Sequence, residues 1–124
     1  MVLAEQITLQ RELAEAICLR LCAEINALGF AATECLLYPC YDEALFELVK
    51  DPFTGTHNLL GYWYDSLKKQ RIGCLNFNSD GSFYAEFDVL KAHPTKCSWC
   101  VESVIAWGQA GNIKAEAKLL PLPQ

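Results

Sequence analysis

Short motifs that mark the common enzyme classes are absent from this sequence. It holds no G-x-S-x-G turn, no glycine-rich phosphate loop and no H-E-x-x-H motif, which argues against α/β-hydrolases, P-loop enzymes and zincin proteases. The chain has only two histidines, so histidine-based catalysis has few participants available. We therefore assign no catalytic residue, expect no cofactor, and lean towards a protein that is not an enzyme.

Long apolar runs are also missing. No segment approaches the roughly 20 apolar residues that span a bilayer, and residues 1–6 lack the basic start and apolar core of a signal peptide. The absence of both features predicts a cytoplasmic protein that does not insert into a membrane.

The chain has 124 residues, of which 52% are hydrophobic and 20% are charged, the size and balance of one globular domain. We expect a single α+β domain over residues 1–124. Ten Lys and Arg stand against fifteen Asp and Glu, which gives a net charge of −5. An acidic chain of this kind disfavours nucleic acid and anionic membranes as partners.

Seven cysteines stand at irregular spacing, and an odd count does not fit a secreted disulfide scaffold. Cys97 and Cys100 form a C-x-x-C pair, but the residues after it favour a strand rather than the helix that a redox motif needs. Cys35 and Cys40 could join this pair as ligands of zinc or an iron–sulfur cluster. The alternative is that these thiols are small apolar residues, and we assign no metal ligand.

Apolar periodicity predicts a helix from about Thr8 to Leu28, with Thr8 as its N-cap and Gly29 as its C-cap. Cys18 and Cys22 stand one turn apart, so they share a side of this helix and we take them as residues at the edge of the core. The apolar stripe consists of Ile7, Leu9, Leu13, Ile17, Leu21, Ile25 and Leu28.

After Gly29 the composition shifts to aromatic and β-branched residues, punctuated by Pro, Gly and Asn or Asp. The pattern predicts strands near 30–38, 44–50, 58–65, 71–78, 82–90, 99–107 and 113–120.

Two hairpins can be placed in register from the sequence. Pairing Phe77 with Phe83 matches their apolar faces and leaves Ser79–Gly81 as a three-residue loop, with Gly81 where positive φ is needed. The second hairpin gives the same agreement, with Gly111 third in its loop. The pairs expected there are Trp107–Ile113, Ile105–Ala115 and Val101–Leu119.

The apolar face of such a sheet needs a cover, and the first helix is the element available to supply it. The predicted fold class is therefore α+β: a long N-terminal helix packed on a curved antiparallel β-meander of about five to seven strands.

Polar and aromatic side chains alternate on the other face of the expected sheet, with Asn76 and Asn78 on a neighbouring strand. Carboxylates at i and i+2 of a strand lie about 7 Å apart, a separation that suits acid–base chemistry through a water molecule. The alternative is a solvated face or a protein-contact face, as antiparallel sheets commonly have. The candidate ligand or partner residues are Tyr62, Tyr64, Tyr84, Glu86, Asp88 and His93.

One basic cluster, residues 68–71, falls between two expected strands. Its ordinary reading is a charged hairpin loop, and its alternative is a contact with an acidic or phosphate partner. Trp63 and Trp107 are candidates for the core or for an interface, since aromatic residues are enriched at both.

These observations favour a small acidic protein that acts through protein–protein contact, as an adaptor, a chaperone-like protein or an immunity-type protein. The contact is either with a protein partner or with a second copy of the chain, which would form a homodimer. Two alternatives stay open. One is binding of a small ligand in a helix–sheet cavity lined by Tyr62, Tyr84, Glu86 or His93. The other is a cysteine metal or redox protein.

Overall fold

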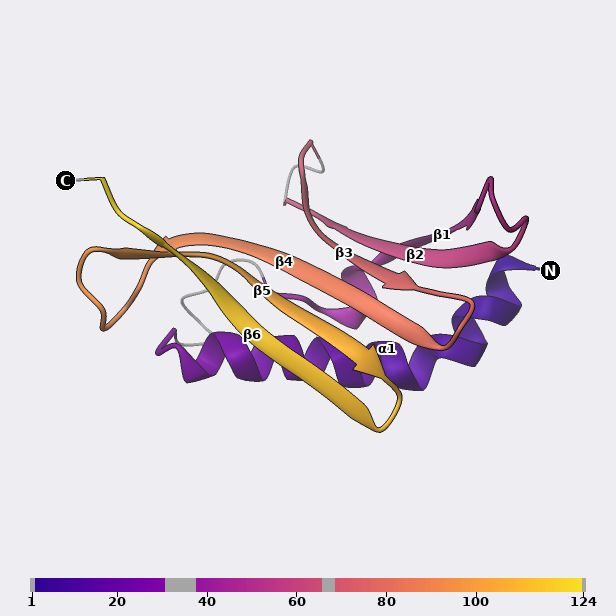
Figure 1. Cartoon of the computed structure of the whole chain (residues 1–124), viewed down its shortest axis with the longest axis horizontal. Helices are drawn as coiled ribbons and strands as arrows, with labels where there is room; N and C mark the ends of the chain where they lie inside the picture. The colour runs from indigo at the N-terminus through magenta and orange to yellow at the C-terminus, as the bar shows by residue number, and fades with distance from the viewer. Residues whose placement is uncertain (1, 31–37, 66–68, 124) are drawn as a thin grey trace.

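The computed structural model describes residues 2–30, 38–65 and 69–123 (Figure 1). The strand expected at 30–38 falls mainly outside these residues. The elements in chain order are α1 (Leu3–Ala27), the 3₁₀ helix η1 (Tyr41–Glu43), β1 (Leu45–Lys50), β2 (His57–Tyr64), β3 (Arg71–Phe77), β4 (Ser82–Ala92), β5 (Trp99–Gln109) and β6 (Asn112–Pro121).

The strands form one antiparallel sheet in the order β1 to β6, and the sheet does not close on itself. Figure 1 shows α1 running behind the sheet, so the molecule has two layers. The predicted α+β meander under one long N-terminal helix is confirmed. Among the described residues, no helix contains a stretch that is long and apolar enough to cross a membrane.

Helix α1 begins five residues earlier than the sequence predicted. Thr8 is not its N-cap: its hydroxyl donates to the carbonyl of Ala4, 2.9 Å away, inside the helix. The expected helix end is confirmed, because Gly29 takes a φ of +108° directly after the last turn. The buried stripe is narrower than predicted, since Leu9 is 70% exposed. It consists of Ala14, Ile17, Cys18, Leu21 and Ile25.

The helix-facing side of the sheet forms the core with α1. Trp63 is 2% exposed, meets the Phe87 ring edge-on at 5.8 Å between centroids, and donates from Nε1 to the Cys40 carbonyl at 2.9 Å. Gly73 makes room for this ring pair. A Cβ at that position would lie 2.7 Å from the carbonyl oxygen of Glu86.

The β3–β4 hairpin has the predicted register. Phe77 pairs with Phe83, and Gly81 takes a φ of +91° in the loop between them. Both rings are buried against α1, which fixes the register because a slip of one residue would turn them out.

The β5–β6 hairpin differs from its predicted register by one residue. Ile113 pairs with Gly108 rather than with Trp107, and the turn is one residue shorter. Gly108 has a φ of +126°, and a Cβ there would lie 2.3 Å from the Asn112 carbonyl oxygen, a contact that only glycine allows. The shift turns Trp107 and Ile105 onto the face opposite to the one predicted.

A bulge then restores the predicted pairing further along the same two strands. Val101 pairs with Leu119 as expected, while Ser103 pairs with Lys118, so Glu102 is the extra residue of β5. The hairpin prediction was therefore wrong at the turn and right beyond the bulge.

Strand β4 has a similar irregularity at the same level. Asp88 pairs with Ser103 and Lys91 pairs with Val101, so β4 advances by three residues where β5 advances by two. Leu90 in this stretch has a φ of +52° and is 65% exposed. Between the same two pairing positions, β6, β5 and β4 therefore advance by one, two and three residues, respectively.

Candidate functional site

One side of the sheet faces away from α1, and we call it the open face. In the described part of the chain, no helix or strand lies over it. Its side chains are nevertheless partly buried by one another, and Ile105 is only 7% exposed. Two cross-strand rows form its centre: Glu47, Leu60, Asn76, Tyr84 and Trp107, and beside them Leu45, Tyr62, Cys74, Glu86 and Ile105.

Three buried polar atoms on the open face have no hydrogen-bond partner among the described residues: Asn58 Oδ1, Asn76 Oδ1 and Ser103 Oγ. Buried polar groups in folded proteins are nearly always paired, and an unpaired one costs about 1–3 kcal/mol. The open face therefore presents polar atoms that a second molecule can satisfy.

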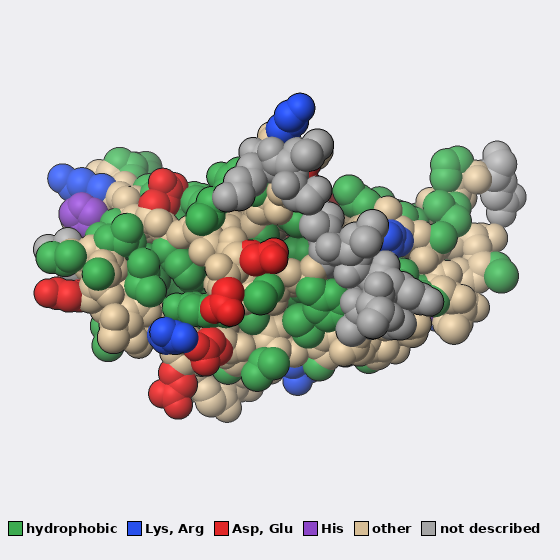
Figure 2. Space-filling view, turned by 180° about the vertical axis from the view of Figure 1, so that it is seen from behind, with side chains coloured by type: hydrophobic (Ala, Val, Ile, Leu, Met, Phe, Trp, Pro, Cys, Tyr) green, Lys and Arg blue, Asp and Glu red, His purple; other side chains and the backbone are tan. Residues whose placement is uncertain are grey.

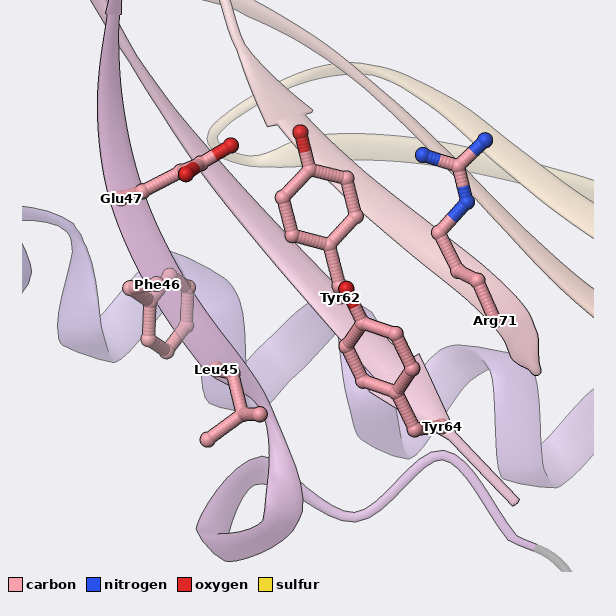
Figure 3. A pocket seen from close by; sticks show the side chains of 6 residues that line it. All are labelled: Leu45, Phe46, Glu47, Tyr62, Tyr64 and Arg71. Carbon is pink, nitrogen blue, oxygen red and sulfur yellow. The ribbon is translucent and has the colours of Figure 1, made fainter. Parts of the chain in front are cut away.

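A hollow of about 370 Å³ lies at the β1 side of the open face (Figure 3). Figure 3 shows Tyr62 standing between Glu47 and Arg71. The Arg71 guanidinium carbon lies 5.2 Å from the Tyr62 ring centre, and the Tyr64 ring lies 6.4 Å away. Burial, and then a hydrogen bond to Glu47, raise the pKa of Tyr62 above its ordinary value. The lining residues are Leu45, Phe46, Glu47, Tyr62, Tyr64 and Arg71.

A second hollow, of about 290 Å³, lies further along the same strands at the β1–β2 turn. Asn58 and Asn76, whose amide oxygens are unpaired among the described residues, line it together with Phe53. Phe53 is 97% exposed, and its amide donates to the Asp51 carboxylate at 2.8 Å, which fixes the turn. The turn thus holds an exposed aromatic ring beside two acceptor atoms.

The β4 carboxylates, Glu86 and Asp88, lie between β3 and β5 on the open face. Burial raises the pKa of Asp88 above its ordinary value, and the charges of Glu86 and Glu102 raise it further, while Arg71 opposes them. Burial and Glu86 also raise the pKa of the Cys74 thiol on the neighbouring strand. This part of the open face therefore favours the approach of a cation.

His93 is separated from the other predicted site residues. It lies past the end of β4, where its Nδ1 accepts hydrogen bonds from the amides of Thr95 and Lys96 at 3.1 and 2.9 Å. Its visible role is to fix the β4–β5 turn. The other five share the open face: Tyr62, Tyr64, Tyr84, Glu86 and Asp88.

Because Tyr62, Tyr84 and Glu86 face away from α1, the structure does not place them in a cavity between helix and sheet. A hollow of about 500 Å³ does lie where the start of α1 meets the ends of β2 and β3, and other residues line it. Gln6, Gln10 and Phe77 are among them.

The described cysteines are distributed over three regions, one of which is the open face with Cys74. Cys18, Cys22 and Cys40 line a hollow of about 410 Å³ beside α1, where burial is the main cause that raises the pKa of Cys18 to about 12. Cys97 and Cys100 instead flank the start of β5, and Cys35 lies outside the described residues. Where the chain is described, no three His, Cys, Asp or Glu side chains are placed to hold a metal ion.

Figure 2 looks at the molecule from the opposite side, where acidic side chains gather over the centre and lower left. Two carboxylates of α1 have a basic partner one turn away. Arg11 pairs with Glu15 at 2.7 Å and Arg20 with Glu24 at 3.2 Å. These are the ion pairs among the described residues, so the acidic groups of the open face have none there.

Sequence reasoning missed three contributors to the open face. Glu47 stood in a short strand with no polar pattern of its own. Arg71 was placed at the start of the expected strand 71–78, which is confirmed, but it was grouped with the basic cluster 68–71 rather than with the open face. Ser103 was hidden by the register shift, since the predicted pairing put its neighbours Ile105 and Trp107 on the helix side. What these three residues share is a position beside other site residues on neighbouring strands. That position can be recognised only when the pairing register of the strands is known.

Comparisons with protein-family models, with curated proteins and with solved structures find no match to this chain. Its function must therefore be argued from the open face itself.

Proposed function

We propose that this chain is a protein-binding module with no catalytic role, and that its open face docks a partner protein whose contact surface is apolar and basic. The supporting observation is that the open face combines half-buried aromatic rings with buried polar atoms that have no hydrogen-bond partner among the described residues. Aromatic anchors such as Tyr84 and Trp107 are typical of the centres of protein interfaces.

Charge supports a basic partner. Five carboxylates lie on or beside the open face, against the cations Arg71, Lys114 and Lys118. The carboxylates are those of Glu47, Glu86, Asp88, Glu102 and Glu116. The chain as a whole carries −5. Complementary charge speeds association and sets orientation, so a partner with Lys or Arg at this surface is favoured over a neutral one.

A second copy of the chain is a poorer occupant. In a two-fold dimer the same patch meets itself, and β4 lies near the middle of the sheet. Glu86 and Asp88 would then approach their own copies, and like charges brought together across an interface cost several kcal/mol.

We place this interaction in the cytoplasm. Cys40 and Cys97 are free, exposed thiols. Exposed free thiols persist in a reducing compartment, whereas an oxidising one converts them to disulfides.

The experiment uses a photo-crosslinking amino acid at Tyr84 in cells of the native source. Leu19, which is 71% exposed on α1, is the control position. The protein captured at Tyr84 and not at Leu19 is purified, and its affinity for the full chain is measured with and without Trp107→Ala. We expect Trp107→Ala to weaken the complex by about tenfold or more, as truncation of an aromatic anchor does.

Two results would overturn the proposal. One is an affinity unchanged by Trp107→Ala, which would move the contact off the open face. The other is a homodimer of the isolated chain that Trp107→Ala dissolves, measured by light scattering, which would make a second copy the occupant.

A further inference from the structure

Three carboxylates gather at the level where β4 and β5 bulge. Glu86 and Asp88 stand two residues apart on β4, so both face outward on the open face, about 7 Å apart. Glu102, the extra residue of the β5 bulge, lies close enough to Asp88 to act on its titration. Among the described residues none of the three forms an ion pair, because the two ion pairs there both belong to α1.

A second and independent feature stands at the same place. Ser103 lies directly opposite Asp88 in the β4–β5 pairing, so the two side chains share the open face. Ser103 is 0% exposed, and its Oγ has no hydrogen-bond partner among the described residues. A fully buried hydroxyl oxygen without a hydrogen-bond partner, beside carboxylates without an ion pair, can accept a hydrogen bond from an N–H donor.

The spread of these oxygens decides which cation fits. The described residues do not bring three potential ligands together around one point, as a metal ion requires. A guanidinium group is larger, since it is a plane with five N–H donors that reach more than one carboxylate. It is also more weakly hydrated than an ammonium group, which suits a half-buried surface.

We propose that Asp88, Glu86, Glu102 and Ser103 form a subsite that binds an arginine side chain of the partner protein. The guanidinium donates to the Asp88 and Glu86 carboxylates and to Ser103 Oγ, and Glu102 adds attraction from the bulge. This inference rests on the proposed function, because it names the group that the docked partner inserts.

Two cations of the chain itself lie near the subsite. Arg71 acts on Asp88 from β3 but lies over the Tyr62 ring, and Lys118 stands opposite Ser103 on β6 with an exposed side chain. Both compete with an incoming arginine for the same carboxylates. Lys118→Gln should therefore tighten binding of an external guanidinium rather than weaken it.

The test is an NMR titration of the ¹⁵N-labelled full chain with N-methylguanidinium chloride over the millimolar range, at ionic strength held constant with NaCl. We expect saturable shifts of the backbone amides of Glu86, Asp88, Glu102 and Ser103. Asp88→Asn should weaken this binding about tenfold, in line with the loss of one hydrogen bond to a charged group. Glu12→Gln, an equal charge change on the exposed side of α1, should leave it unchanged.

Ser103→Ala separates a specific site from general attraction to acidic groups. We expect weaker methylguanidinium binding in this variant even though its charge is unchanged. Shifts that rise linearly without saturation, or that survive Asp88→Asn, would overturn the subsite. Equal shifts with methylammonium chloride would overturn its assignment to arginine.

The inference and the proposed function can fail separately. If Trp107→Ala abolishes the partner complex while Asp88→Asn leaves its affinity unchanged, the open face docks the partner and the arginine subsite is wrong. If methylguanidinium binds as expected but crosslinking from Tyr84 captures no partner that Trp107→Ala affects, the subsite stands and the proposed function fails.

Discussion

The two faces of this sheet are built from the same strands, yet they are completed to different degrees. The helix-facing side buries Trp63, Leu75 and Phe87 under α1, and the Trp63 indole N–H is bonded. The open face also holds large side chains, but its rings Tyr62, Tyr84 and Trp107 are only half buried. Its buried polar atoms lack partners among the described residues.

This difference separates stability from recognition. Residues on the helix-facing side hold the fold together, because removing them leaves a cavity that the surrounding core cannot close. Residues on the open face have packing on one side only, so the folded chain loses less when they are truncated. Substitutions that pair one residue from each face measure how far this division holds.

The largest expected effect is that of Trp63→Ala. Loss of this buried ring and of its bond to the Cys40 carbonyl should lower the free energy of unfolding by about 3–5 kcal/mol. Urea denaturation followed by circular dichroism measures the change. A loss below about 1 kcal/mol would show that the helix–sheet core is not the main source of stability.

Gly73→Ala tests the close approach on the same face without removing a side chain. The new methyl group would meet the Glu86 carbonyl oxygen at 2.7 Å and the Trp63 ring at 3.0 Å. The strain should cost about 1–3 kcal/mol of unfolding free energy. Cys74→Ala, the next residue but on the open face, is the control and should cost less in the same denaturation assay.

Trp107→Ala should cost about 1 kcal/mol or less, although it removes the same side chain as Trp63→Ala. Its ring is half buried and packs on the open face only. Chemical denaturation of both variants in parallel gives the comparison directly. Equal losses in the two variants would mean that the two faces contribute alike, and the division between stability and recognition would fail.

Asp88→Asn is the smallest change and has the opposite sign. The folded state raises the pKa of Asp88 above its ordinary value of 3.8, so ionisation of this group opposes folding. Its favourable contribution is complete below pH 3.8 and is lost as the pH rises through the folded-state pKa.

The Asp88→Asn variant should therefore be more stable than the parent at pH 7, by about 0.5 kcal/mol or less for a partly exposed group, and should lose this advantage near pH 3. The groups that face Asp88 are Glu86, Glu102, Arg71 and, across Ser103, Lys118. Urea midpoints at the two pH values measure the change, with Glu12→Gln as the charge control. A variant less stable than the parent at pH 7 contradicts this expectation.

The two long hairpins explain how far the sequence could be interpreted. For β3–β4, matching apolar faces and a glycine in the loop led to the correct pairing of Phe77 with Phe83. For β5–β6 the same two signs agreed on a pairing that was wrong by one residue. Trp107 and Ile105 are apolar but face outward, so apolar character was no guide to the helix side there.

The candidate site was predicted in part for the same reason. Tyr84, Glu86 and Asp88 alternate on a strand whose other face is buried, and such alternation can be recognised in one strand alone. The contribution of Ser103 depends on a bulge, and that of Glu47 on a neighbouring strand. Neither position has a local sequence pattern, because pairing across strands creates it.

The stepped bulges of β6, β5 and β4 have a consequence for the shape of the sheet. Between the same two pairing positions, β6, β5 and β4 advance by one, two and three residues. Each strand is therefore longer there than its neighbour on the β6 side. An extra length of about 3.3 Å per strand, over a strand spacing of about 4.8 Å, corresponds to a bend of the strands of up to roughly 40° within the sheet. The strands therefore change direction within the open face at Asp88 and Ser103. A partner helix or strand that is aligned with the strands on one side of the bulges is no longer aligned with them on the other side.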